Sequence, residues 1–321
     1  MRLFQDAALQ RIFGILVAIL IVASVVGYLL AWRQRRGAGT VSATVANLNS
    51  RVRAWWVMCI VFTVALATGG IGSVVLFGIL SLLALREFLT LTPTGIEDHD
   101  TLLWVFYFFT PLQYVLVAVK WYGLFSIMIP VYAFLLLPTL MAMGGQTRGF
   151  LARTATVQWG LLTCVYCLSY APALINLDAD NFAGQGAKLL LFLVIVVQSS
   201  DVCQYIFGKL FGRHHLAPNI SPNKTVEGYI GGGIIATGLA AGIFWITPFS
   251  PLAAAAFGLV IVVMGSAGGL VMSAIKRDQG IKDFGTLIRG HGGILDRFDS
   301  VTFAAPIFFQ LVRFFYHGGA F

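Results

Sequence analysis

Residues 12–32 read IFGILVAILIVASVVGYLLAW, a stretch without a charged residue. An α-helix of about 20 apolar residues spans the hydrocarbon layer of a bilayer. The stretch is followed by the basic residues Arg33, Arg35 and Arg36 and not by a small-residue cleavage site. We therefore interpret the stretch as a retained membrane span and not as a signal peptide. This stretch predicts an integral membrane protein.

The composition of the whole chain agrees with a lipid environment. Of its 321 residues, 58% are hydrophobic and only 11% are charged, whereas a soluble domain is about a quarter charged. The net charge of +8 fits the gathering of basic residues in cytoplasmic loops of membrane proteins. The sequence has no basic stripe with interleaved aromatic residues, so we expect membrane lipids and no nucleic acid as partners.

Nine more apolar runs follow the first, which predicts an all-α, polytopic transmembrane bundle of about nine or ten spans. Two short runs, 54–68 and 70–87, meet at Gly69-Gly70, which favours a tight helical hairpin. No linker separates two folded units, so we divide the chain only into an N-terminal membrane region over 1–185, with about six spans, and a C-terminal region over 186–321. The runs cover 12–32, 54–68, 70–87, 101–119, 121–143, 155–175, 187–207, 226–247, 251–275 and 301–317.

The positions of the basic residues predict which side of the membrane each loop faces. If loop 33–53 lies in the cytoplasm, the N-terminus lies outside, and ten alternating spans put loops 208–225 and 276–300 in the cytoplasm as well. The acidic loop near 88–100 is an exception, but acidic residues count little in this rule. We expect a multi-pass protein of the cytoplasmic membrane whose two most polar loops face the cytoplasm.

The first polar segment runs from Asp201 to Gly228. Asp201 lies near the end of an apolar run, and a lone carboxylate in a membrane needs a cation, a proton or a water-filled cavity. Lys224 and the hydroxyls of Ser221 and Thr225 precede the next run and could hold phosphate oxygens at a helix N-terminus. The alternatives are that Asp201 reaches the membrane interface and that the two hydroxyls are ordinary helix caps.

The second polar segment, from Ser273 to Asp299, mixes charges of both signs with glycines. Asp296 and Asp299 fall on one face if their segment is helical, and Mg²⁺ prefers a few carboxylates together with substrate phosphates. Glycines around His291 let backbone N–H groups approach a ligand. Neighbouring lysines and arginines could neutralise a transferring phosphoryl group. The alternative is an ion-pair network that joins two helices.

Together the two segments resemble the signatures of the phosphatidate cytidylyltransferase (CDP-diacylglycerol synthase) family, over roughly residues 187–315. The pattern S-x-x-K-R-x4-K-D-x-G-x2-I-P-G-H-G-G-x-x-D-R-x-D is matched at Ser273, Lys276, Arg277, Lys282, Asp283, Gly285, Ile288, Gly290, His291, Gly292, Gly293, Asp296, Arg297 and Asp299. A second block is matched at Asp201, Tyr205, Gly208, Lys209, Gly212, Leu216, Ala217, Pro218, Ser221, Pro222, Lys224, Thr225, Glu227 and Gly228.

The resemblance implies that phosphatidic acid, or a related lipid phosphate, attacks the α-phosphorus of CTP, so that CDP-diacylglycerol forms and pyrophosphate leaves. It also implies Mg²⁺ with a monovalent cation such as K⁺ in a paired site, a catalytic role for region 186–321, and a homodimer as one arrangement of the chain. The implied metal ligands are Asp201, Asp296 and Asp299. The implied catalytic residues are Asp296, Asp283, His291 and Lys276, and the implied substrate- and phosphate-binding residues are Ser221, Lys224, Thr225, Arg277, Lys282, Gly292, Gly293 and Arg297.

Three positions depart from the family pattern and indicate a divergent paralogue. Gly269 stands where the family has a metal-binding aspartate, Met272 where it has a glutamate, and Arg289 where it has a proline. Two alternatives to the enzyme therefore stay open. One is a related CTP-using lipid kinase or transferase, and the other is a non-catalytic lipid-binding membrane protein.

Overall fold

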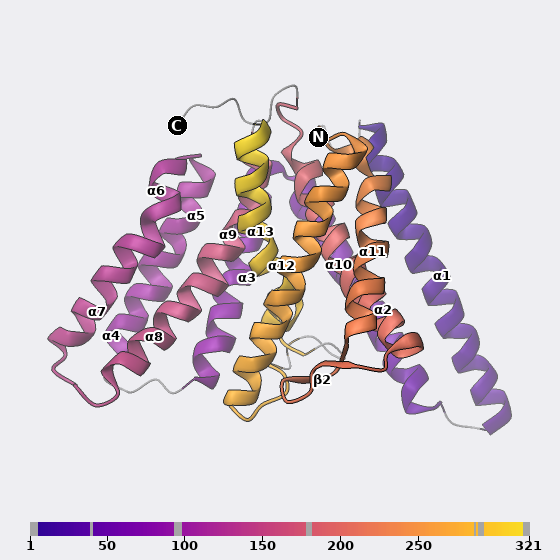
Figure 1. Ribbon diagram of the computed structural model, residues 1–321, viewed down its shortest axis with the longest axis horizontal. Helices are drawn as coiled ribbons and strands as arrows, with labels where there is room; N and C mark the ends of the chain where they lie inside the picture. The colour runs from indigo at the N-terminus through magenta and orange to yellow at the C-terminus, as the bar shows by residue number, and fades with distance from the viewer. Residues whose placement is uncertain are drawn as a thin grey trace.

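The computed structural model describes residues 6–38, 41–92, 98–177, 182–285, 287 and 292–316, and these residues are almost entirely helical. Within them, nine helical segments are long and apolar enough to cross a membrane. The helices stand side by side across the molecule, with α1 at one edge and α7 at the other (Figure 1). The prediction of a polytopic helical bundle with about nine or ten spans is confirmed.

Three of the spans are built from shorter helices joined by π-helical turns at Val105–Phe109, Met128–Ala133 and Leu162–Cys167. Short 3₁₀ turns lie at Leu174–Asn176 and Phe244–Ile246. The α-helices are α1 (Ala7–Ala38), α2 (Ala43–Ala67), α3 (Gly69–Leu91), α4 (His99–Trp104), α5 (Thr110–Ala118), α6 (Tyr122–Ile127), α7 (Phe134–Met143), α8 (Phe150–Leu161), α9 (Leu168–Ala173), α10 (Gly186–Phe211), α11 (Val226–Gly242), α12 (Pro251–Asp278) and α13 (Leu295–Tyr316).

The tight hairpin predicted at Gly69-Gly70 is present. A single residue, Thr68, separates α2 from α3. The backbone of Gly69 has a φ of +85°, a left-handed conformation that glycine adopts at little cost. This turn lets two membrane helices run back to back without a loop between them.

The tenth predicted span is the shorter helix α11, which has 17 residues and packs between α10 and α12. Its glycines permit a close approach to α10, because a Cβ built on Gly232 would lie 2.5 Å from the Cα of Gln204. Thr225 caps the helix, since its Oγ1 accepts a hydrogen bond from the N–H of Gly228 at 3.1 Å. The structure therefore shows the Thr225 hydroxyl as an ordinary helix cap, which was the alternative to a role in phosphate binding.

One small sheet interrupts the helical fold within the described residues. β1 (His215–Ala217) pairs antiparallel with β2 (Ser221–Thr225), with Ala217 opposite Ser221. The residues that precede the predicted span at 226–247 thus form a strand, and the helix begins directly after it. Pro222 lacks a backbone N–H, but each strand of a two-stranded sheet is an edge strand, where proline is tolerated.

The helices also extend into the two polar loops. α10 continues to Phe211, α12 continues to Asp278, and α13 begins at Leu295. The loops predicted at 208–225 and 276–300 therefore shrink to 212–225 and 279–294. Both loops lie at the end of the bundle where β2 is found (Figure 1).

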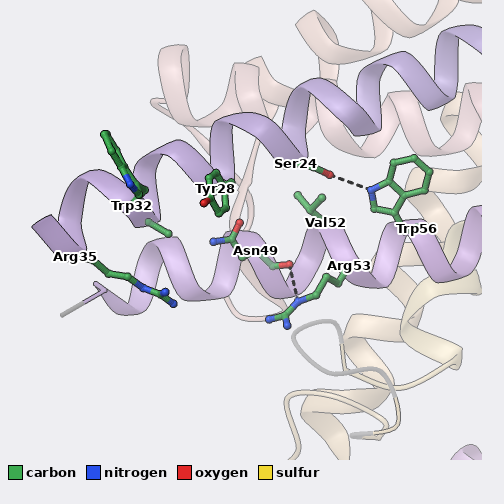
Figure 2. A pocket seen from close by; sticks show the side chains of 9 residues that line it. Ser24, Tyr28, Trp32, Arg35, Asn49, Val52, Arg53 and Trp56 are labelled. Carbon is green, nitrogen blue, oxygen red and sulfur yellow. Dashed lines mark hydrogen bonds between the residues drawn. The ribbon is translucent and has the colours of Figure 1, made fainter. Parts of the chain in front are cut away.

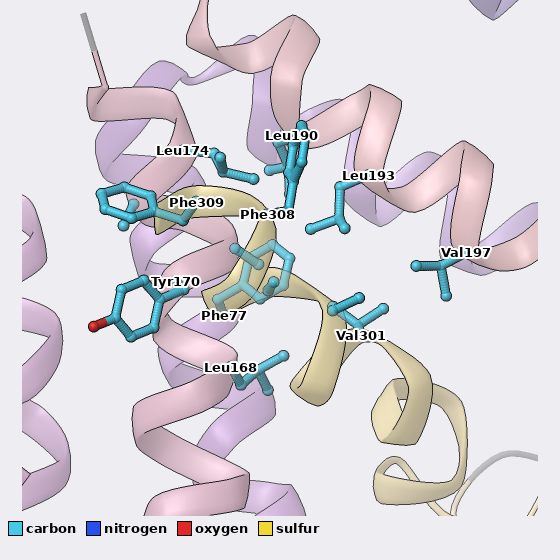
Figure 3. Packing of buried hydrophobic residues seen from close by; sticks show 14 of the residues in the cluster. Phe77, Leu168, Tyr170, Leu174, Leu190, Leu193, Val197, Val301, Phe308 and Phe309 are labelled. Atoms are coloured by element: carbon cyan, nitrogen blue, oxygen red, sulfur yellow. The ribbon is translucent and has the colours of Figure 1, made fainter. Parts of the chain in front are cut away.

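A hydrophobic core holds α13 in the middle of the bundle. Figure 3 shows Phe308 of α13 among buried side chains of α3, α9 and α10, including Phe77, Leu168 and Leu190. Phe308 also stacks on Phe192 of α10, with ring centroids 5.7 Å apart. This packing fixes the start of α13 relative to the ends of α10 and α12, which determines the position of the polar residues described next.

Candidate functional site

The two predicted polar segments meet at one end of the bundle. Asp201 comes from α10, Lys224 from β2, and Asp299 and Ser300 from the first turns of α13. The packing of α10, α11, α12 and α13 on one another brings these side chains together from positions about a hundred residues apart.

Two carboxylates share one buried hydroxyl at this place. Ser300 Oγ lies 3.2 Å from Oδ2 of Asp201 and 3.3 Å from Oδ1 of Asp299. The backbone N–H of Ser300 also donates to Oδ1 of Asp299 at 2.7 Å. A hydroxyl has one proton to donate, so it can satisfy only one of the two carboxylates at a time. The pair is therefore a concentrated negative charge that favours a cation.

Lys224 supplies one such cation. A Cβ built on Gly269 of α12 would lie 3.0 Å from Lys224 Nζ, 3.6 Å from Ser300 Oγ and 3.8 Å from Asp299 Oδ2. An aspartate at position 269 would thus place its carboxylate among these groups. With glycine there, the site has two carboxylates and the Lys224 ammonium, which attracts both.

Asp296 lies one turn away and is bonded on both of its oxygens. Oδ1 accepts from Lys276 Nζ at 2.8 Å, and Oδ2 accepts from the backbone N–H groups of Phe284 at 2.9 Å and Gly293 at 3.0 Å. Asp296 is 8% exposed, so these charge-assisted bonds are shielded from water. The Asp296 carboxylate thus joins the end of α12 and the following loop to the start of α13. This arrangement agrees with the alternative interpretation of the segment as an ion-pair network that joins two helices.

Glu87 of α3 is a further part of this loop that the sequence reasoning did not identify. Its Oε1 accepts from the N–H of Ile294 at 3.0 Å, and its Oε2 accepts from the N–H of Leu295 at 3.0 Å. The carboxylate therefore caps the N-terminus of α13 from a different helix. A Cβ on Gly285 would lie 2.6 Å from Oε1, and a Cβ on Gly293 would also collide with the carboxylate.

A signal for Glu87 was present in the sequence. It is the only acidic residue between Asp6 and Glu97, and it lies at the end of a predicted span. The rule that singled out Asp201, that a lone carboxylate in a membrane helix needs a partner, applies equally to Glu87. Ser300 gave no comparable signal, because serine is common in helices of every kind.

The predicted phosphate-binding cations on α12, on the following loop and on α13 differ in their surroundings. Arg277 donates from Nε to the carbonyl of Ile220 at 3.2 Å and from a terminal nitrogen to the carbonyl of Ile281 at 3.1 Å, so it ties α12 to the loops on both sides. Arg297 Nε, by contrast, is buried and has no hydrogen-bond partner among the described residues. Lys282 is exposed. The Nε–H of Arg297 is thus a buried donor that is available to an anion.

The remaining predicted residues lie around the same loop or outside the described residues. Asp283 is exposed, and Gly292 has a φ of +83° where its backbone turns beside Asp296. Ser221 begins β2, the strand that also carries Lys224. His291 and Arg289 lie outside the described residues, so the predicted role of His291 stays a prediction.

Residues 49–315 of the chain match the cytidylyltransferase family. The chain is 37% identical over 310 residues to the uncharacterized protein YnbB of Escherichia coli (strain K12), covering 95% of this chain and 99% of that protein. It is 35% identical over 250 residues to the phosphatidate cytidylyltransferase of Bacillus subtilis (strain 168), covering 76% of this chain and 86% of that protein. It is 31% identical over 257 residues to the phosphatidate cytidylyltransferase of Staphylococcus aureus (strain COL), covering 77% of this chain and 92% of that protein.

The matched residues include every helix that contributes to the site, from α3 with Glu87 to α13 with Asp299. The resemblance that the two polar segments indicated is confirmed over a much longer part of the chain. The chain belongs to the cytidylyltransferase family.

Proposed function

We propose that the chain is a CTP-dependent cytidylyltransferase that converts phosphatidic acid, or a related lipid phosphate, to CDP-diacylglycerol and pyrophosphate. The observation that carries this proposal is the meeting of Asp201, Asp299 and Lys224 at the end of membrane helices. A site at the end of membrane helices suits a substrate whose phosphate lies at the interface while its acyl chains stay in lipid. Two relatives named phosphatidate cytidylyltransferase support the same chemistry.

The proposed reaction needs positioning and charge neutralisation more than acid–base chemistry. An oxygen of the lipid phosphate forms a bond to the α-phosphorus of CTP, and the bond from the α-phosphorus to the oxygen that bridges to the β-phosphate breaks, which releases pyrophosphate. The lipid phosphate is already an anion at neutral pH, so no base has to activate it. Lys224 and the free Nε–H of Arg297 are suited to neutralise the phosphate oxygens.

Mg²⁺, which the family resemblance implies, fits the carboxylate pair. Asp201 and Asp299 would hold the ion, and it would polarise phosphate oxygens in the site. Among the described residues, no three His, Cys, Asp or Glu side chains gather closely enough to bind a metal. Mg²⁺ accepts such a site, since it commonly takes one or two carboxylates plus substrate phosphates and water.

We also propose that the site faces the cytoplasm, where CTP is found. The support is the basic residues that lie at this end of the bundle, which the positive-inside rule places in the cytoplasm. They include Lys209, Arg213, Lys224, Lys276, Arg277 and Lys282.

The experiment that tests the function follows the label of CTP in purified, detergent-solubilised protein with Mg²⁺ and phosphatidic acid. Label from the α-phosphate is expected in a lipid product, whereas label from the γ-phosphate is expected to leave in pyrophosphate. Transfer of the γ-label to lipid would instead identify a lipid kinase. If neither label appears in a lipid product with any of several lipid phosphates, the proposed reaction is wrong and the protein is a non-catalytic lipid-binding protein.

A carboxylate added at position 269 is expected to tighten Mg²⁺ binding. In Gly269→Asp the new carboxylate joins Asp299 and Asp201, so the Mg²⁺ concentration for half-maximal turnover should fall by roughly tenfold. Titration of Mn²⁺ by electron paramagnetic resonance gives a second measure that does not depend on turnover. Gly269→Asn has the same size without the charge and serves as the control. Equal cation affinity in the two variants would mean that Lys224 neutralises the added carboxylate.

A further inference from the structure

A groove lined by polar, aromatic and apolar side chains lies between α1 and α2, two helices that contribute no side chain to the candidate site described above. It has a volume of about 500 Å³ and is lined by nine residues, among them Tyr28, Trp32, Arg35, Arg53 and Trp56 (Figure 2). All of α1 precedes residue 49, where the match to the cytidylyltransferase family begins. The groove is thus partly built by a segment that the family resemblance does not cover.

Hydrogen bonds between the two helices define the groove. At one end, the indole N–H of Trp56 donates to Ser24 Oγ at 3.0 Å. Nearer the hairpin tip, the Asn49 amide donates to the carbonyl of Gly27 at 3.2 Å, and a Cβ on Gly27 would collide with Asn49. These contacts fix the two helices against each other, so the groove is a preformed feature of the hairpin.

The open end of the groove carries uncompensated positive charge. Arg35 and Arg53 line it, and Arg33, Arg36 and Arg51 lie within two residues of them. The sequence has no acidic residue between Asp6 and Glu87, so the hairpin supplies no carboxylate for these arginines. Among the described residues, neither Arg35 nor Arg53 forms an ion pair. The counter-charge must come from outside the hairpin.

The surroundings of the arginines match a membrane interface. Tyr28 and Trp32 are exposed about two turns and about one turn before Arg35, and such aromatic side chains favour the headgroup region of a bilayer. Further along α1, Ile21, Val22 and Val25 are exposed on a helix surface that suits acyl chains. The tip of the hairpin lies at the same end of the bundle as β2 (Figure 1).

We propose that this groove binds the headgroup of an anionic phospholipid, with its phosphate between Arg35 and Arg53 and its acyl chains along the apolar surface of α1. Guanidinium groups bind phosphate oxygens in pairs of hydrogen bonds, and basic residues next to membrane helices attract anionic lipids. This lipid site is separate from the candidate site on α10, β2 and α13, and it does not depend on the reaction proposed for that site. It would keep an anionic lipid beside the protein on the side where the lipid substrate reacts.

The test is native mass spectrometry of the full-length protein in detergent with equimolar phosphatidylglycerol and phosphatidylcholine of the same acyl chains. The wild type is expected to retain phosphatidylglycerol in preference. The double variant Arg35→Gln/Arg53→Gln should lose roughly tenfold or more of that retention. The matched control is Arg33→Gln/Arg51→Gln, which removes two charges from the same tip but from residues that do not line the groove, and it should retain the lipid.

Two further measurements keep the proposal open to refutation. Ala31→Phe fills the groove without changing its charge and should also lose the lipid, which guards against a folding defect in the arginine variant. Inorganic phosphate at matched concentration should not displace the lipid. Equal loss in both double variants, equal retention of the two lipids by the wild type, or displacement by phosphate alone would overturn the proposal.

Discussion

Replacing Asp201 with asparagine is expected to lower CTP-dependent lipid labelling at least about a hundredfold. Within the part of the chain that the structure describes, Asp201 and Asp299 are the two carboxylates that meet at Ser300, so the loss of Asp201 leaves Asp299 alone beside Lys224. A single carboxylate next to an ammonium attracts a divalent cation weakly, because the lysine already neutralises it. Asparagine keeps the size of the side chain, and therefore the packing between α10 and α13.

The matched control for this variant is Asp278→Asn. Asp278 is exposed at the end of α12, on the same end of the bundle, and its side chain bonds only to Gln279 among the described residues. The substitution removes the same charge without touching the carboxylate pair, so we expect turnover near that of the wild type. If Asp201→Asn and Asp278→Asn retain equal activity, the carboxylate pair does not take part in the reaction.

The sequence was sufficient to predict the class of the fold and the two polar segments of the candidate site, but not the contribution of Glu87. Apolar runs indicate membrane helices because the bilayer has a fixed thickness, and lone charges in such runs are conspicuous. Asp201 could therefore be selected before its position was known, and Lys224 could be selected because it directly precedes an apolar run. Their meeting with Asp299 depends on how α10, α11 and α12 pack, and periodicity does not predict which membrane helices become neighbours.

Two features of the site illustrate what could not be predicted. Asp296 was expected to act as a metal ligand, a role that stays a prediction, while the structure shows it accepting from Lys276 and two backbone N–H groups. These backbone donors belong to an irregular loop, whose course no repeating pattern specifies. Gly269 could be recognised as a departure from the family, but its position within reach of the Lys224 ammonium follows only from the folded structure.

Replacing Glu87 with alanine is expected to destabilise the protein by about 2–4 kcal/mol and to release the start of α13. The substitution removes both acceptors of the Ile294 and Leu295 N–H groups and leaves an empty space beside Gly285 and Gly293. Thermal unfolding in detergent measures the stability. Hydrogen exchange of the 292–296 segment, at a temperature where the rest of the protein is folded, measures the local effect.

The controls separate the helix cap from a general effect of mutating α3. Arg86→Ala changes the neighbouring, exposed side chain and should leave both measurements unchanged. Glu87→Gln keeps one oxygen acceptor, so it should fall between the wild type and the alanine variant. Because Asp296 accepts from Gly293 in the same turn, exchange that becomes faster at Gly293 in Glu87→Ala would show that α3 holds the loop next to Lys276. Unchanged protection of Ile294 and Leu295 would show that the cap contributes little, and that the loop is held by Asp296 alone.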